Sequence, residues 1–222
     1  TSSTYRQKSA LGPGSAKGEK VDPANRLLWR MNLRRLDSEY VRDAILAVSG
    51  SLNRSLYGPP LPLHVRPDGM VVIKEDGLPT PTSKYRRSIY ILARRNYHLT
   101  MLRVFDQPIV ATHCTVRKPS AVVTQSLTLL HDDFVVEQAG LFADRVIGRA
   151  EQQTEQQQIE TAFRIALGRP PDQEEMQWSV DLLRRHVTRL LREKTTNDEA
   201  HRIAITHVCH MLFNTNEFLY VE

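Results

Sequence analysis

The fold class follows from one stretch of the chain, residues 159–175, which has the sequence IETAFRIALGRPPDQEE. Its apolar residues recur at the spacing of one face of an α-helix; they are Ile159, Ala162, Phe163, Ala166 and Leu167. Gly168 is placed to end this helix, because glycine adopts the left-handed conformation of a helix C-terminus without steric cost. Asp172 and Glu175 have the spacing of a capping box, in which each side chain binds the backbone N–H of the other residue. The stretch therefore predicts two helices joined by a short turn.

Helical spacing continues on both sides of this stretch. Apolar residues step at three and four in two further sets, Val123, Leu127, Leu130 and Phe134, then Val135, Ala139, Phe142 and Val146. Such spacing is typical of the core-facing stripe of an amphipathic helix. The helix after Asp172 has its own inner face of Met176, Val180, Leu183, Val187 and Leu190, and Asn197 starts a last helix that ends near Asn214 or Asn216. We therefore expect a mainly α protein with a helical bundle in its C-terminal half.

The chain divides by composition near its N-terminus. Residues 1–21 are rich in Gly, Ser, Lys and Ala with few apolar side chains, which predicts a flexible linker or N-terminal extension. We expect residues 22–222 to form a single mainly helical domain with sub-regions 22–119 and 120–222. The chain opens at Thr1 within polar sequence, and we expect it to be a piece of a longer protein.

Two helix starts are predicted in the first sub-region. Asp22-Pro23 has a favoured N-cap residue followed by the residue favoured at the first helical position. Asp37 is placed to cap a second helix over residues 38–48, and Gly50 is placed to end it.

The middle of the chain is irregular. Repeated prolines between residues 53 and 82 exclude a long helix there. Residues 69–73 predict a short strand, and residues 88–92 either its partner strand or the start of a buried helix. A helical turn is expected at 99–105. The middle should therefore carry at most a small two-stranded β ribbon.

Composition excludes several classes of protein. Hydrophobic residues make up 41% and charged residues 25% of the 222 residues, and no apolar run approaches the length of a membrane span. The chain has two cysteines and no C-x-x-C, which excludes a zinc ribbon and covalent c-type haem within it. It also lacks G-x-S-x-G, H-E-x-x-H and a glycine-rich phosphate loop, so we lean against an enzyme.

The net charge of +5 is unevenly distributed. Residues 77–105 contain no acid and six basic residues, whereas residues 132–199 contain 14 acids and 9 basic residues, a net charge of −5. The basic stretch could face a polyanion such as a sulfated glycan, or it could be neutralised by the acidic helices that follow it. We favour the second hypothesis, and we expect no nucleic-acid partner because the rest of the chain is a weak electrostatic footprint for one.

Arginines are the candidate contacts for a ligand or partner. Arginine outnumbers lysine 23 to 7, and its planar fork suits bidentate pairing with carboxylates. The candidates are Arg34, Arg35, Arg42, Arg86, Arg87, Arg94 and Arg95. Arg34, Arg35 and Arg42 lie among acids and could grip a carboxylate or sulfate, but we favour a structural network that ties the first helices to the basic stretch.

Motifs from one end of the chain to the other resemble those of one family. They are DPANRLLWRMN (22–32), RRLDSE (34–39), RDAILAVSG (42–50), GPP (58–60), RRSIY (86–90), FDQP (105–108), CTVRK (114–118), QSLTLL (125–130), ALGRP (166–170) and NTNEFLYV (214–221). In these the chain resembles the planctomycete-specific C-terminal domain of unknown function, a PSD-type domain also called domain of unknown function 1553. It departs from the family pattern at Thr124, where a proline is expected, and at His131-Asp132, where Asn-Asp is expected.

The resemblance implies a setting rather than a reaction. Such domains lie at the C-terminal end of large exported bacterial proteins, commonly downstream of a cytochrome-c-like domain and a second uncharacterised domain. We accordingly expect export to the periplasm or cell surface, no cofactor in this chain, and haem elsewhere in the parent protein. The expected partners are other domains of the parent chain.

Three further groups have both a chemical and a structural interpretation. His207 and His210 lie about 60° apart around a helix, as two metal ligands should, but a site would need His113, Cys114 or His131 as well, and we favour ordinary histidines. Cys114 and Cys209 could form a disulfide in an oxidising compartment, or act as small hydrophobic groups, which we favour. His131-Asp132-Asp133 could supply an acid, a base or metal ligands, but we favour a cap between two helices.

Together these observations favour a non-catalytic structural or docking module of a larger exported, cytochrome-associated protein. The alternative is the binding or processing of anionic, sulfated polysaccharide through the basic residues 84–103.

Overall fold

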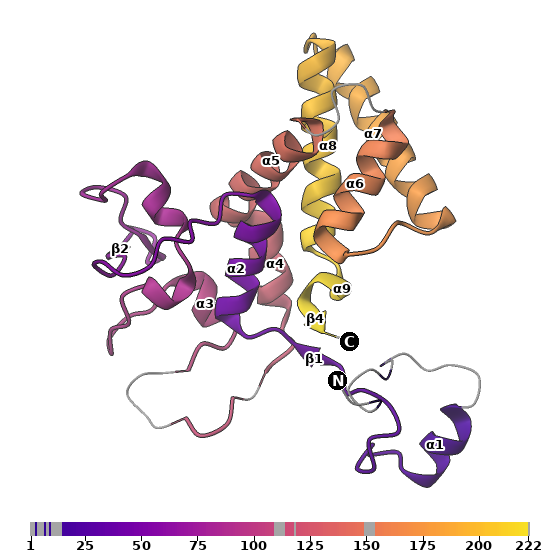
Figure 1. Ribbon diagram of the computed structural model, residues 1–222. Coiled ribbons are helices and arrows are strands. Elements are labelled where there is room, and N and C mark those ends of the chain that lie inside the picture. The colour runs from indigo at the N-terminus through magenta and orange to yellow at the C-terminus, as the bar shows by residue number, and fades with distance from the viewer. Residues whose placement is uncertain are drawn as a thin grey trace.

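After residue 122 the described chain is mainly helical in the computed structural model, and it ends in a short strand (Figure 1). The helices are α4 (Val123–His131), α5 (Asp133–Gly148), α6 (Glu155–Leu167), α7 (Gln173–Arg192), α8 (Asn197–Phe213) and α9 (Asn216–Leu219). The structure describes residues 3, 7, 9, 15–108, 114–117, 119–148 and 154–221. The prediction of a mainly α fold with a helical C-terminal half is confirmed.

The turn between α6 and α7 has the predicted chemistry. Gly168 is left-handed, with a φ of 75°, and its N–H donates to the carbonyl of Arg164 at 3.2 Å. The N–H of Glu175 donates to Oδ1 of Asp172, and the N–H of Asp172 donates to Oε2 of Glu175, both at 2.8 Å. The capping box therefore fixes where α7 begins.

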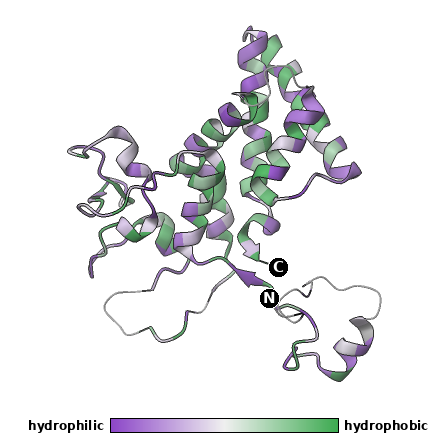
Figure 2. Cartoon of the chain, viewed as in Figure 1, coloured by the Kyte–Doolittle hydropathy of each residue, from purple (hydrophilic) through white to green (hydrophobic). Residues whose placement is uncertain are grey.

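The core lies where α5 and α8 cross and where α2 (Ser38–Ser49) packs on α5 (Figure 1). Phe142 of α5 and Phe213 of α8 are fully buried, and their rings stack with centroids 5.7 Å apart. Ile45 of α2 is fully buried in the same core. Figure 2 shows hydrophobic residues, in green, in all three of these helices. Burial of one apolar stripe from each helix is the main source of stability expected for such a bundle.

Helix α2 begins and ends close to where the sequence predicts. Gly50 follows its last residue with a φ of 84°, and the N–H of Gly50 donates to the carbonyl of Ala47 at 3.3 Å. Asp37 occupies the N-cap position but makes no side-chain cap bond. Its carboxylate instead lies 3.6 Å from Arg117, so Asp37 contributes charge at the helix start rather than a capping acceptor.

The middle of the chain holds the expected ribbon, but with a different partner strand. β3 (Val71–Ile73) pairs antiparallel with β2 (Leu63–Val65). The prediction of residues 88–92 as a partner strand is wrong, since Ser88–Tyr90 forms a short 3₁₀ turn, η3. The N–H and hydroxyl of Ser88 both donate to Asp43 of α2, at 2.8 and 2.7 Å. This contact holds the segment against α2, and Ile91 meets the chain before β2 only through an isolated bridge to Leu61. A second 3₁₀ helix, η2 (Pro81–Tyr85), and α3 (Thr100–Val104) complete the middle.

A second strand pair joins the two ends of the domain. β1 (Arg34–Arg35) pairs antiparallel with β4 (Tyr220–Val221), a contact between segments far apart in the sequence. Nothing in the local pattern of either two-residue segment predicts it.

The prediction of a helix starting at Asp22-Pro23 is wrong. The structure has a helix before that point, α1 (Ser15–Val21), within the segment predicted as a linker. The carboxylate of Asp22 accepts the N–H of Leu27 at 2.7 Å, and the indole N–H of Trp29 donates to the carbonyl of Asp22 at 2.8 Å. Leu28 has a φ of 54°, which a right-handed helix excludes. The segment forms successive turns because its apolar side chains reach no core; Leu27 is 78% exposed.

Candidate functional site

The seven candidate arginines fall into a buried group and an exposed group. Arg35, Arg42 and Arg86 are 5%, 1% and 6% exposed. The exposed members are Arg34, Arg87, Arg94 and Arg95. The two groups have different roles, which follow from their contacts.

Arg42 fastens α2 to the basic stretch. Its Nη1 donates to the carbonyl of Arg86 at 2.9 Å, and its Nη2 donates to the carbonyl of Lys84 at 2.7 Å. Burial lowers the pKa of Arg42 to about 10, an effect that Asp43 at 3.7 Å opposes, so the guanidinium stays charged at neutral pH. The network that the sequence suggests is present here, but backbone carbonyls rather than carboxylates are its main acceptors.

Arg35 closes the loop that joins α3 to α4. Its guanidinium contacts Oδ2 of Asp106 at 2.8 Å and the carbonyl of Ser120 at 2.7 Å. The N–H of Ser120 also donates to Asp106, at 2.7 Å. Burial acts to raise the pKa of Asp106, but the bonds from Ser120 and Arg35 outweigh it and hold that pKa below its ordinary value. The charged groups of Arg35 and Asp106 thus bind each other and Ser120, and they hold residues 106 and 120 together.

The guanidinium of Arg86 also binds groups within the protein. It donates to the carbonyls of Pro59, at 2.9 Å, and of Tyr57, and its guanidinium lies 3.7 Å from the ring centroid of Tyr90. It therefore holds the proline-rich segment against η3 and is not free to bind a ligand.

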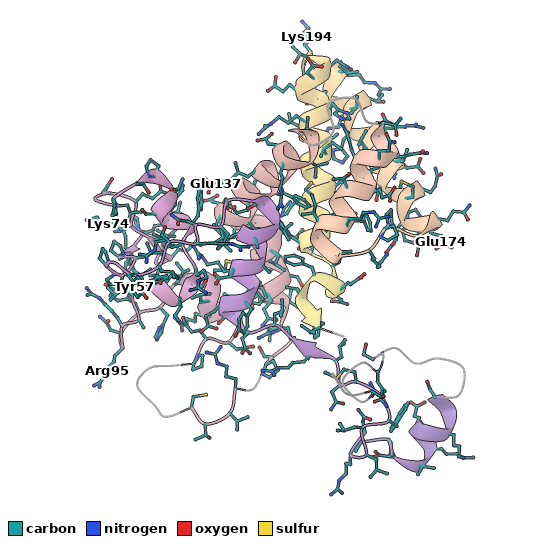
Figure 3. The ribbon with its side chains drawn as sticks, in the orientation of Figure 1. Tyr57, Lys74, Arg95, Glu137, Glu174 and Lys194 are labelled. Atoms are coloured by element: carbon teal, nitrogen blue, oxygen red, sulfur yellow. The ribbon has the colours of Figure 1, made fainter. Side chains whose placement is uncertain are left out.

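The hypothesis that the later helices neutralise the basic stretch is wrong for most of it. Lys84 fits, since it contacts Glu137 of α5 at 3.2 Å as well as Glu75 at 3.1 Å. For Arg87, Arg94, Arg95 and Arg103, which are all exposed, the described part of the chain supplies no carboxylate at ion-pair distance. Figure 3 shows Arg95 at the outer edge of the middle region, pointing away from the bundle.

The reason lies in the acidic helices themselves, whose carboxylates find nearer partners. Arg164 pairs with Glu160 one turn away at 2.7 Å, and Arg202 pairs with Asp144 of the packed helix α5 at 2.6 Å. The net charge of a long segment does not show which of its charges are already paired with each other.

A cavity of about 450 Å³ lies between the β2–β3 ribbon, η2, α3 and the first turn of α5. Its lining combines an apolar floor with charged walls. The apolar members are Met70, Val71, Val72, Ile73, Leu99, Met101 and Phe134; the charged members are Arg42, Arg66, Glu75, Lys84, Asp132, Asp133 and Glu137. The volume is within the usual range of ligand-binding sites in proteins.

A charged network crosses one wall of this cavity. Lys84 contacts both Glu75 and Glu137, and the hydroxyl of Tyr85 donates to Glu137 at 2.7 Å. Burial acts to lower the pKa of Lys84, but the two carboxylates hold it above its ordinary value. Burial and the bond to Glu137 raise the pKa of Tyr85. Both groups thus keep their protons at neutral pH, and the network is suited to binding rather than to proton transfer.

The motif at residues 131–133 has the predicted structural role and also a second one. Asp132 lies between α4 and α5, and its Oδ1 accepts the N–H of Phe134 at 2.9 Å. Burial, with Asp133 beside it, raises the pKa of Asp132 despite this bond. Asp132 and Asp133 also line the cavity, which the sequence alone does not indicate because most of the other lining residues lie far away along the chain, Arg66 among them.

The histidines and cysteines show no metal cluster. Nowhere in the described ranges do three His, Cys, Asp or Glu side chains gather as metal ligands would, and His113 lies outside those ranges. His210 shares a hydrogen bond with the carbonyl of Leu129, with its Nε2 at 2.7 Å, and the ring of His207 lies edge-on to that of His186 at 4.4 Å. Burial, then the nearby positive charges, lowers the pKa of His207.

Both cysteines are free thiols. Cys114 is exposed, whereas Cys209 of α8 is buried in the hydrophobic core. Burial raises the pKa of the Cys209 thiol. This position agrees with the interpretation of Cys209 as a small hydrophobic group.

The apolar stripe of α4 faces outward, against the expectation from its spacing. Val123, Leu127 and Leu130 are 75%, 48% and 46% exposed. The buried residues of α4 are instead Gln125 and Leu129. The amide of Gln125 donates to the carbonyl of Val104 at 3.1 Å, so this side of the helix faces α3. Because the stripe points away from the core, α4 presents an apolar surface that the described chain does not cover.

The sequence of the chain is similar to one known family. A family model described as PSD1, protein of unknown function (DUF1553), matches residues 1–183. No curated protein and no solved structure matches the chain. Within the described residues, no helix has both the length and the apolar character that crossing a membrane requires.

Proposed function

The chain belongs to the PSD1 family of unknown function (DUF1553), and we propose that it is a non-catalytic docking module that binds a folded neighbouring domain of its parent protein through α4. The observation that carries this proposal is the outward-facing stripe of Val123, Leu127 and Leu130. Exported location and a haem-bearing domain elsewhere in the parent protein belong to the same proposal, and rest on the family resemblance.

The composition of α4 suits a protein partner. The helix VTQSLTLLH carries no Asp, Glu, Lys or Arg, so its outer face offers apolar side chains and hydroxyls but no fixed charge. Apolar surface of this kind is stabilised when a partner covers it with apolar side chains. Burying the exposed parts of the three apolar side chains would contribute about 3 kcal/mol, at about 1 kcal/mol each.

The buried arginines support a scaffold rather than an active site. Arg35 and Arg42 are held by backbone carbonyls and by one neighbouring carboxylate each, and they join segments that are distant in sequence. Groups engaged in this way are not positioned to act on a substrate.

Site-specific photo-crosslinking in the intact parent protein tests the proposal. A benzoylphenylalanine residue placed at Leu127 is expected to crosslink to a segment of the same polypeptide outside residues 1–222. The matched control is the same residue at Ile89 of η3, which is 77% exposed and lies on another face, and it should not form this crosslink. If Leu127 yields crosslinks only within residues 1–222, the docking proposal is wrong.

The four exposed arginines of the basic stretch favour a second candidate function, binding of sulfated polysaccharide. Arg87, Arg94, Arg95 and Arg103 are exposed, and no carboxylate of the described residues lies at ion-pair distance from them. A sulfated-glycan array at moderate salt should show binding that Arg94→Glu with Arg95→Glu weakens at least tenfold. The control pair Arg185→Glu with Arg192→Glu, exposed on α7, makes the same charge change and should have less than a twofold effect. Equal weakening by both pairs would show general charge attraction and remove this candidate.

A further inference from the structure

The cavity lies along the edge of β3 that faces away from β2, where α3 takes up one backbone group, the N–H of Val71. Hydrogen bonds at the two ends of the ribbon run from Arg66 N–H to the Met70 carbonyl, at 2.7 Å, and from Lys74 N–H to the Pro62 carbonyl, at 2.9 Å. With the register His64 opposite Val72, these bonds fix which backbone groups face β2. In an antiparallel ladder the hydrogen-bonded residues alternate with residues whose N–H and C=O groups point outward. Val71 and Ile73 are therefore the outward-pointing residues of β3.

The outward side of β3 faces the cavity. The N–H of Val71 donates to the hydroxyl of Thr100 on α3, at 2.8 Å, which shows the direction of this edge. Val71, Ile73 and Thr100 all line the cavity. The Val71 carbonyl and the N–H and carbonyl of Ile73 point to the same side as the Val71 N–H, because both groups of an outward residue leave the ladder on that side.

The open wall of the cavity carries an excess of negative charge. Its carboxylates are Glu75, Asp132, Asp133 and Glu137, and its cations are Arg42, Arg66 and Lys84. Arg42 is 1% exposed and directs its nitrogens at carbonyls and at Ser88, so four acids face two accessible cations. Lys84 already occupies the position between Glu75 and Glu137. Arg66 lies 3.3 Å from Asp133, and no other cation of the described residues lies at ion-pair distance from Asp132 or Asp133.

We propose that this cavity binds an extended peptide segment that pairs with β3 as a third strand and directs a lysine or arginine side chain toward Asp132 and Asp133. A strand edge supplies affinity through its main-chain groups, and pockets beside it select alternate side chains. The apolar floor of Met70, Leu99 and Phe134 suits the apolar residues that would alternate with the basic ones. This site is separate from the outer face of α4, so it goes beyond the docking function.

Fluorescence anisotropy with synthetic peptides tests strand addition directly. The probe is the peptide Val-Lys-Val-Lys-Val amide with fluorescein on its N-terminal amine, so that both lysines keep their charge, titrated with the whole chain. Two further peptides carry backbone N-methyl groups, one at the odd and one at the even positions. Since alternate residues of an added strand point their N–H groups at β3, one methylated peptide should bind at least tenfold more weakly, and the other within threefold of the parent peptide. Equal behaviour of the two methylated peptides, or no saturable binding of the parent peptide, overturns the proposal.

Charge recognition is tested by substitutions on the peptide and on the protein. Replacing both lysines of the peptide by glutamate should abolish binding. Asp133→Asn, at an 84% exposed side chain, should weaken binding of the lysine peptide at least threefold. Glu174→Gln on α7 should leave it unchanged, since Figure 3 shows Glu174 on the opposite side of the molecule from Glu137, which lines the cavity. Binding that tolerates glutamate in the peptide contradicts the proposed site. Leu127→Glu should not affect this assay, so its outcome is independent of docking through α4.

Discussion

The substitution Arg42→Ala should destabilise the protein by about 3–5 kcal/mol. It removes the charged donor from three acceptors, the carbonyls of Lys84 and Arg86 and the hydroxyl of Ser88. A buried group that loses its partner costs about 1–3 kcal/mol, and breaking a buried charged network costs about 3–5 kcal/mol in comparable proteins. Because Arg42 also lines the cavity, water can reach part of the vacated space, which places the expected loss within that range rather than above it.

Urea unfolding followed by circular dichroism measures this loss, and hydrogen exchange locates it. Residues 81–92 should exchange faster in the variant than in the wild-type chain, while α7 keeps its protection, because Arg42 holds only the first of these segments. Arg42→Lys should recover only part of the stability, since an ammonium cannot present the two parallel donors of a guanidinium. Arg192→Ala, on the exposed surface of α7, is the control and should change stability by less than about 0.5 kcal/mol. A loss below about 1 kcal/mol for Arg42→Ala would refute the view that it holds the middle to α2.

Three other predictions follow from single sites. Gly168→Ala should lower the free energy of unfolding by about 1–2 kcal/mol, because a Cβ is disfavoured at a φ of 75°. The urea midpoint should fall accordingly, and an unchanged midpoint contradicts this. In the native chain a thiol reagent should modify the exposed Cys114 rapidly and the buried Cys209 only after unfolding; fast modification of two thiols would show that the core position of Cys209 is wrong. Arg169 holds the pKa of Glu175 below its ordinary value of 4.5, so the stability from this pair is complete above that pH and is lost as the pH falls through the lower folded value. Glu175→Gln should therefore flatten the loss of stability between about pH 5 and 3, and an unchanged acid profile would contradict the assignment.

The helices of the C-terminal half could be predicted because their signals are local. The capping box of Asp172 and Glu175 and the left-handed Gly168 involve residues within one turn of each other, and the structure has both. The start at Asp22-Pro23 failed although its residues are typical of a helix start. A cap chooses where a helix begins only if an apolar face follows that can be buried, and Leu27 has no core to enter.

The candidate site could be predicted only in part. The arginines were identified by residue type, but type does not distinguish the buried Arg42, which serves the fold, from the exposed Arg94 and Arg95. The sequence also could not predict the rotation of α4, because Val123, Leu127 and Leu130 have the same spacing whether they face inward or outward. The contacts that hold the opposite side of α4 inward, Leu129 in the core and Gln125 on the carbonyl of Val104, are tertiary contacts.

By itself the sequence determined the helices of the C-terminal half, where the most strongly capped of them begin and end, and that this chain has the motifs of its family. These properties depend on interactions within a few residues, which the order of amino acids specifies directly. Only the tertiary structure decided which charges are buried, which face of α4 stays open and which acids meet at the cavity beside β3. Those properties depend on contacts between segments distant in sequence, and such contacts form only when the helices pack together.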